Sequence, residues 1–158
     1  PTSIAIDSAG NLYVTDIGAG GLTAPNFYSG STLIRKIAPD AAVTTLAGTF
    51  GFTEEPNDGN VAQFSSSDGI AVDGAGNIFV LDHFNHGNRI LRLAPDGNVA
   101  ALPIDESQFG HLSGLAIDTD DNLYASDDEK NTIDKITQAG SVTTYAGKSG
   151  EAGSTDTP

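Results

Sequence analysis

The chain has no cysteine among its 158 residues. Neither a disulfide framework nor a thiolate metal site can therefore form. Basic residues are also few. The chain has 7 Lys and Arg and 21 Asp and Glu, which gives a net charge of -14. This charge repels phosphate backbones and anionic lipid surfaces, so we expect no nucleic acid partner.

Long apolar runs are missing as well. No stretch approaches the roughly 20 apolar residues that cross a bilayer, so we expect no membrane insertion. Helix-favouring runs are absent too, whereas 19 glycines separate short clusters of Thr, Val, Ile and Tyr, a composition that favours many short strands joined by turns. Since the sequence begins with Pro1 and not with Met, we expect a mature or trimmed product with an extracellular or periplasmic location.

What the sequence contains instead is one unit repeated three times. Its first half reads SIAIDSAGNLYVTD at 3–16, GIAVDGAGNIFVLD at 69–82 and GLAIDTDDNLYASD at 114–127. A second half follows each time, LIRKIAPDAAVTTLAG from residue 33, RILRLAPDGNVAALP from residue 89 and TIDKITQAGSVTTYAG from residue 132. In all three second halves an Ile and a Val stand nine positions apart, so the halves match in spacing as well as in residue type.

Each unit predicts four short antiparallel strands, because its apolar residues alternate with polar or aromatic ones. Four strands in a repeat of about 40 to 45 residues are typical of a β-propeller blade. The spacing from Asp73 to Asp118, 45 positions, fits this length. The predicted fold class is therefore all-β, a β-propeller of four-stranded antiparallel blades with three blades in this chain.

The motif GIAVDGAGNIFVLD, followed by Asn-Arg-Ile and Pro-Asp-Gly, with VTTLAG in the first unit, resembles the NHL repeat over nearly the whole chain. The resemblance implies a propeller that usually has six blades, of which this chain would supply half. It also implies binding of protein, RNA or ligands or, as in similar lyases and hydrolases, metal-assisted chemistry. It does not choose among these functions.

The units set the expected organisation of a single propeller segment, 1–158. Its expected parts are blade 1 at about 3–48 with an inserted loop at 17–32, a linker at 49–68, blade 2 at about 69–103, blade 3 at about 114–147 and a C-terminal linker at 148–158.

Both insertions, 17–32 and 49–68, are expected on one rim of the propeller. Strands alternate in direction, so the loop between strands two and three emerges beside the linker that enters the next blade. All three histidines and many carboxylates fall on this rim. The candidate ligand-binding residues there are Phe27, Tyr28, Asp82, His83, His86, Asp105, Glu106, His111 and Asp127.

Histidines on neighbouring blades raise the alternative of a zinc site. His83, His86 and His111 are the candidate ligands, with a carboxylate nearby. Loop histidines are more often solvated or bonded within turns, so we expect no cofactor and keep zinc as the alternative.

A calcium loop is the second metal alternative. Asp118, Asp120 and Asn122 have the alternate spacing of such a loop, but Leu123 stands where the loop needs Gly. The equivalent stretches in the other two units read as hairpin turns, so we predict a turn here and keep a weak calcium site as the alternative.

No Gly-x-Ser-x-Gly elbow, Walker loop or dinucleotide fingerprint occurs in the chain. The leading hypothesis is a non-enzymatic interaction or assembly module that binds a protein or glycan through the acidic rim. The alternatives are a metal-assisted lyase or hydrolase and a structural subunit of an open polymer. Three blades leave two apolar faces uncovered, so we expect an oligomer in which a second copy, or the missing blades, completes the ring.

Overall fold

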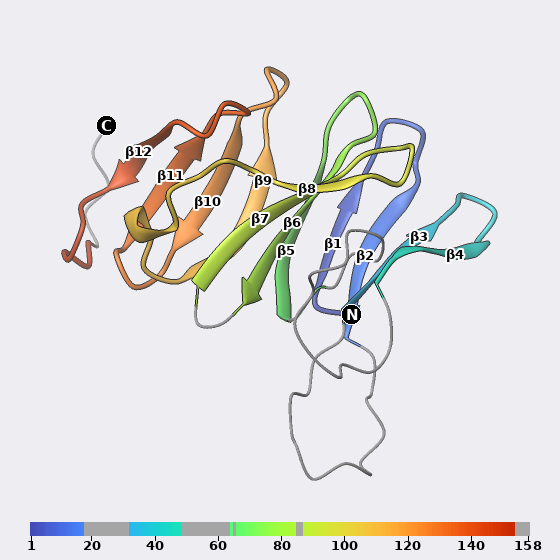
Figure 1. Cartoon of the computed structure of the whole chain (residues 1–158), viewed down its shortest axis with the longest axis horizontal. Coiled ribbons are helices and arrows are strands. Elements are labelled where there is room, and N and C mark those ends of the chain that lie inside the picture. Colours follow the sequence, from blue (N-terminus) through green and yellow to red (C-terminus); the bar gives the residue numbers. More distant parts are fainter. Residues whose placement is uncertain (18–31, 49–63, 65, 85–86, 154–158) are drawn as a thin grey trace, which may run out of the picture.

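A computed structural model of the chain describes residues 1–17, 32–48, 64, 66–84 and 87–153 (Figure 1). These residues form three separate four-stranded antiparallel sheets, each of which pairs its strands in sequence order. The predicted fold class, a propeller of four-stranded blades with three blades in the chain, is confirmed. Within the described ranges the one helix is a short 3-10 turn, η1 (Glu106–Gln108), and no helix there is long and apolar enough to cross a membrane.

The strands of the three blades follow the repeated units. Blade 1 contains β1 (Ser3–Ile6), β2 (Leu12–Ile17), β3 (Thr32–Ile37) and β4 (Val43–Ala47). Blade 2 contains β5 (Ser66–Val72), β6 (Ile78–Phe84), β7 (Gly87–Leu93) and β8 (Val99–Ala101). Blade 3 contains β9 (Leu112–Ile117), β10 (Leu123–Asp127), β11 (Thr132–Ile136) and β12 (Val142–Gly147).

Two of these strands begin earlier than the repeated motif suggested. The expected starts of blades 2 and 3 were residues 69 and 114, whereas β5 begins at Ser66 and β9 at Leu112. The extra residues extend the sheets toward the rim that carries the histidines. Of the expected inserted loop, 17–32, the two end residues belong to β2 and β3, and the rest lies outside the described residues. Most of the expected 49–68 linker lies outside them too, as do Phe27, Tyr28 and His86.

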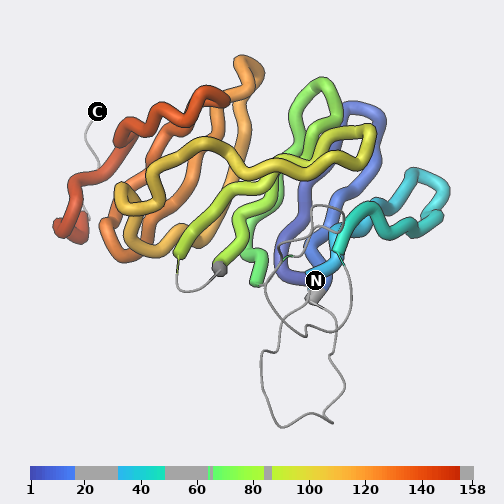
Figure 2. Tube along the Cα trace, viewed as in Figure 1, coloured from blue at the N-terminus to red at the C-terminus, as the bar shows by residue number. Residues whose placement is uncertain are grey.

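Blade 2 lies between the other two blades, and both of its faces are buried (Figure 2). Strand β6 shows how one sequence serves both faces, because side chains alternate along a strand. Ile78 and Val80 pack toward blade 1, whereas Phe79 and Leu81 pack toward blade 3, and none of the four is more than 3% exposed. This explains why the strand reads as a continuous apolar run.

The junction of blades 1 and 2 is one apolar cluster. Tyr13 and Ile34 of blade 1 pack there with Ile70, Val80 and Leu91 of blade 2. The junction of blades 2 and 3 forms a second cluster of the same design. The two junctions hold the three sheets side by side and fix which strand ends meet at the rim.

Candidate functional site

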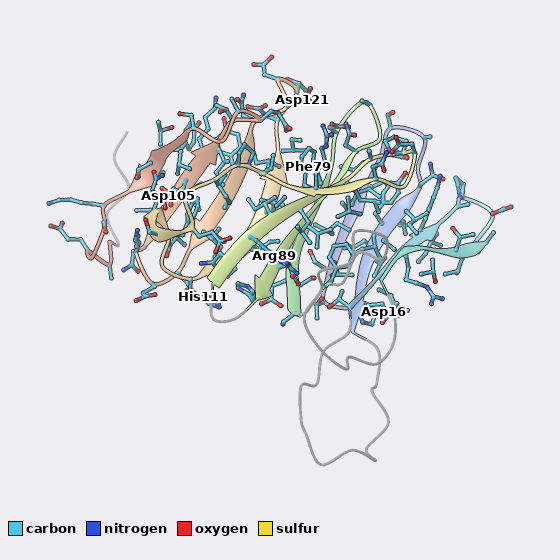
Figure 3. All side chains as sticks on the ribbon, viewed as in Figure 1. Asp16, Phe79, Arg89, Asp105, His111 and Asp121 are labelled. Carbon is cyan, nitrogen blue, oxygen red and sulfur yellow. The ribbon has the colours of Figure 1, made fainter. Side chains whose placement is uncertain are left out.

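The structure brings two of the candidate histidines together at the junction of blades 2 and 3. His83 is in β6 near its end, and His111 comes directly before β9. Their rings are stacked, with centroids 4.9 Å apart and planes 4° from parallel. Figure 3 shows His111 and Asp16 on the same lower edge of the blades, opposite the hairpin that carries Asp121.

A carboxylate lies beside each of the two imidazoles. His83 Nε2 is 3.3 Å from Asp68 Oδ2, and His111 Nδ1 is 3.0 Å from Asp128 Oδ1. The His83 contact is an ion-pair distance without hydrogen-bond geometry, since the buried Nε2 atom has no hydrogen-bond partner among the described residues. We call these four residues the histidine rim. Its two carboxylates are accessible enough to attract cationic groups.

Exposure differs across the histidine rim. The side chains of His83 and Asp68 are 17% and 40% exposed, whereas those of His111 and Asp128 are 53% and 59% exposed. Blade 2 therefore provides the more enclosed half and blade 3 the more accessible half. A partner would meet His111 and Asp128 first.

The backbone that carries His111 is held by a buried carboxylate. Asp127, only 1% exposed, accepts hydrogen bonds from the backbone N–H groups of Gly110 at 2.6 Å, His111 at 3.2 Å and Lys130 at 2.9 Å. The fit around Gly110 is close, because a Cβ there would lie 2.8 Å from Asp127 Oδ1. Asp127 thus positions His111 without reaching the surface itself.

A buried amide fastens the same segment to blade 2. Asn88 in β7 donates from Nδ2 to the Gly110 carbonyl at 2.8 Å, and its Oδ1 accepts from the Leu112 N–H at 3.0 Å. Both contacts cross the junction between the blades. The stacking of the two histidines therefore rests on ordered polar contacts beneath it.

Asp82, expected on the binding rim, is also fully buried. Arg89 donates to its Oδ2 from Nε at 2.9 Å and from Nη2 at 2.7 Å, and the Ser67 hydroxyl donates to its Oδ1 at 3.1 Å. The equivalent residue of blade 1, Asp16, lies 3.2 Å from the Pro1 nitrogen. The residue at this strand end therefore has a different partner in each blade.

The other expected rim residues contribute less. Asp105 caps η1, since its Oδ1 accepts from the Ser107 N–H at 3.1 Å and from the Ser107 hydroxyl at 2.7 Å. These bonds lower the pKa of Asp105. Glu106 is exposed beside it. In Figure 3, Asp105 is set back from the edge that carries His111.

The calcium-like stretch forms a turn on the opposite rim. Both oxygens of Asp118 accept hydrogen bonds, from the N–H groups of Asp120 at 3.0 Å and Asn122 at 2.8 Å, from the Asn122 side chain and from the Tyr124 hydroxyl. The Asn122 side chain is the main reason why the pKa of Asp118 falls to about 2. Within the ranges that the structure describes, no group of three or more His, Cys, Asp or Glu is arranged to hold a metal ion.

Sequence reasoning missed two residues of this region, Asp68 and Asn88. Asp68 stands before GIAV where the other units have a hydroxyl residue, Thr2 before SIAI and Ser113 before GLAI. An acidic residue at a position that is otherwise neutral was an available signal. Asn88 carries no comparable signal, because its two bonds reach residues more than 20 positions away.

No protein-family model matches the chain, and no curated protein matches it. It is similar to a chain of a nidogen/laminin complex, with a TM-score of 0.64 and 20% identity over 92% of this chain and 47% of that chain. It is also similar to a luciferin-regenerating enzyme, with a TM-score of 0.57 and 15% identity over 89% of this chain and 45% of that one. A putative gluconolactonase gives a TM-score of 0.55 and 17% identity over the same two shares, 89% and 45%.

These likenesses show the fold alone. The neighbours are β-propeller proteins, so they support the propeller fold and not the NHL family in particular. The chain spans about half the length of each of them. Both interaction proteins and enzymes occur among these structures, so the fold does not choose between binding and catalysis.

Proposed function

We propose that this chain is a non-catalytic interaction module of a β-propeller that binds a partner protein through the histidine rim. The observation that carries the proposal is the pair of exposed carboxylates, Asp68 and Asp128, which flank the stacked imidazoles at the junction of two blades. The net charge of -14 favours a partner with basic side chains. A glycan is the less favoured ligand, and a secreted location stays a prediction.

The arrangement suits binding because its base is rigid and its surface is polar. Asp127 and Asn88 fix the backbone beneath His111, so little conformational entropy is lost when a partner docks. The two imidazoles add donors, acceptors and flat apolar faces between the carboxylates. A lysine or arginine of the partner would lie between the two charges, where both attract it.

A matched pair of double variants tests this proposal. Asp68→Asn with Asp128→Asn removes the rim carboxylates, whereas Asp120→Asn with Asp121→Asn removes two exposed charges from the opposite rim. Both proteins gain the same two units of charge. The probe is a fluorescein-labelled ten-lysine peptide, whose affinity is measured by anisotropy in low salt.

We expect the rim variant to weaken binding about fivefold relative to the control, which corresponds to two exposed ion pairs of about 0.5 kcal/mol each. Equal affinities for the two variants would mean that net charge alone attracts the peptide, and would overturn the rim assignment. A different outcome would point to a carbohydrate ligand. In that case the wild type would bind a glycan and not the basic peptide, and only the rim variant would lose the glycan.

The alternative function is that of a metal-assisted lyase or hydrolase. The specific observation in its favour is that His83 and His111 come together from adjacent blades, since imidazoles are common zinc ligands. A third protein ligand would have to come from outside the described residues, which contain no group of three. Elemental analysis of the purified protein distinguishes the two functions. Stoichiometric zinc that is lost in both His83→Ala and His111→Ala would replace the binding module by a metal site.

A further inference from the structure

The face of blade 3 that points away from blade 2 resembles the face of blade 1 that packs on blade 2. The Tyr13 hydroxyl donates to Asp7 Oδ2 at 3.0 Å, and the Tyr124 hydroxyl donates to Asp118 Oδ2 at 3.0 Å. A lysine ammonium lies near each ring, 5.8 Å from the Tyr13 centroid and 5.6 Å from that of Tyr124. The two faces are therefore built alike, down to their polar contacts.

Only one of these two faces is covered. Blade 2 packs on the face of blade 1, where Tyr13 is 6% and Ile34 0% exposed. On blade 3 the residue equivalent to Ile34 is Ile133, which is 37% exposed. Tyr145, 67% exposed, packs edge-on against Tyr124 on this side, with ring centroids 5.0 Å apart. In the described part of the chain nothing covers this apolar face.

Blade 1 exposes the complementary half of the same junction. In blade 2, Ile70 is 3% exposed and packs with Val72 in the cluster that receives blade 1. The equivalent residues of blade 1, Ile4 and Ile6, are 61% and 64% exposed. Arg35, on the same face, has a buried Nε atom that lacks a hydrogen-bond partner among the described residues. Buried donors normally have acceptors, so this atom also indicates a missing neighbour.

The two exposed faces cannot meet within one chain. Blade 1 and blade 3 lie at opposite ends of the molecule, with blade 2 between them (Figures 1 and 2). The 158 residues correspond to 45–47% of the length of the propellers that they resemble.

We infer that two copies of this chain associate head to tail, with blade 3 of each copy packed on blade 1 of the other. At each of the two identical junctions, Ile133 takes the place of Ile34, and Ile4 takes the place of Ile70. Ile34 and Ile70 belong to one apolar cluster in the observed junction of blades 1 and 2. A two-fold axis then closes six blades into a ring and leaves no apolar blade face exposed. The inference does not depend on what the histidine rim binds.

Light scattering on the 158-residue chain is the first test. The chain has a mass of 16.2 kDa, and we expect twice that mass at micromolar concentration. A folded species of 16.2 kDa would overturn the inference. So would a mass that grows steadily with concentration, because it would show an open polymer.

Charged variants then test which faces meet. Ile4→Glu and Ile133→Lys each place a charge on one exposed face, so each variant alone is expected to be monomeric. An equimolar mixture should regain the dimer, because one junction then contains the Glu–Lys pair and the other is unchanged. This rescue distinguishes head-to-tail association from a dimer that joins two copies of the same face.

Ala100, exposed on β8 and away from both end faces, provides the matched controls. Ala100→Glu and Ala100→Lys should remain dimers. Melting curves followed by circular dichroism verify that every variant is folded. A folded Ile4→Glu protein that stays dimeric, or a mixture that stays monomeric, would overturn the inference.

Discussion

Asp127 is the residue whose removal tests most directly how the fold positions the histidine rim. It is buried, and three backbone N–H groups, those of Gly110, His111 and Lys130, donate to it. Replacement by Ala leaves these donors without their acceptor. Replacement by Asn keeps one acceptor oxygen but turns an amide group toward the donors.

The size of the effect follows from the number of bonds and from their exposure. A hydrogen bond to a charged group contributes about 1.5–3 kcal/mol, but His111 is exposed, and its N–H regains water when the carboxylate is lost. We therefore expect Asp127→Ala to lower the free energy of unfolding by about 3 kcal/mol and Asp127→Asn by about half as much. For a chain of this length, about 3 kcal/mol corresponds to a fall in Tm of roughly 6–12 °C.

Urea denaturation of the two variants measures this loss, and amide exchange at Gly110 and His111 reports whether the segment has loosened. The control is Asp128→Ala. Its side chain is 59% exposed and pairs only at the surface with His111, so the loss should stay below about 1 kcal/mol. An Asp127→Ala protein within 0.5 kcal/mol of the wild type would refute the positioning role.

Repetition made the fold predictable from the sequence. Three units with the same spacing specify three similar sheets, and the continuous apolar run of β6 agrees with a blade 2 that is covered on both faces. The turn at Asp118 was also predictable, because two equivalent stretches carry its bonding pattern. Asp7 and Asp73 accept from N–H groups two and four residues ahead, as Asp118 does.

The site was less predictable, because its contacts are not repeated. The sequence assigned His83 and His111 to neighbouring blades, but their stacking depends on Asn88, which joins the blades beneath them. Asp82 and Asp127 were expected at a binding surface, whereas the structure buries both. Their partners are an arginine on the next strand and backbone groups up to 17 positions away, and no local pattern marks such partners.

Two further substitutions test the scaffold. Gly147→Ala should lower the free energy of unfolding by more than about 2 kcal/mol, because Gly147 has φ 86° and a Cβ there would lie 2.2 Å from the Asn131 carbonyl oxygen. Gly74→Ala is the control. A Cβ at Gly74 would have nothing within 4 Å, so thermal melts of this variant should be nearly unchanged. Asp118→Asn should lower Tm at neutral pH, because hydrogen bonds, chiefly from the Asn122 side chain, hold the pKa of Asp118 at about 2, below its ordinary value of 3.8. A depressed carboxylate pKa stabilises the fold above the ordinary value, and this stabilisation is lost as the pH falls through the folded value. The difference in Tm between the wild type and Asp118→Asn should therefore be full above pH 3.8 and should disappear as the pH approaches about 2. A difference of the same size at pH 2 and pH 7 would show that the turn depends on the shape of the side chain and not on its charge.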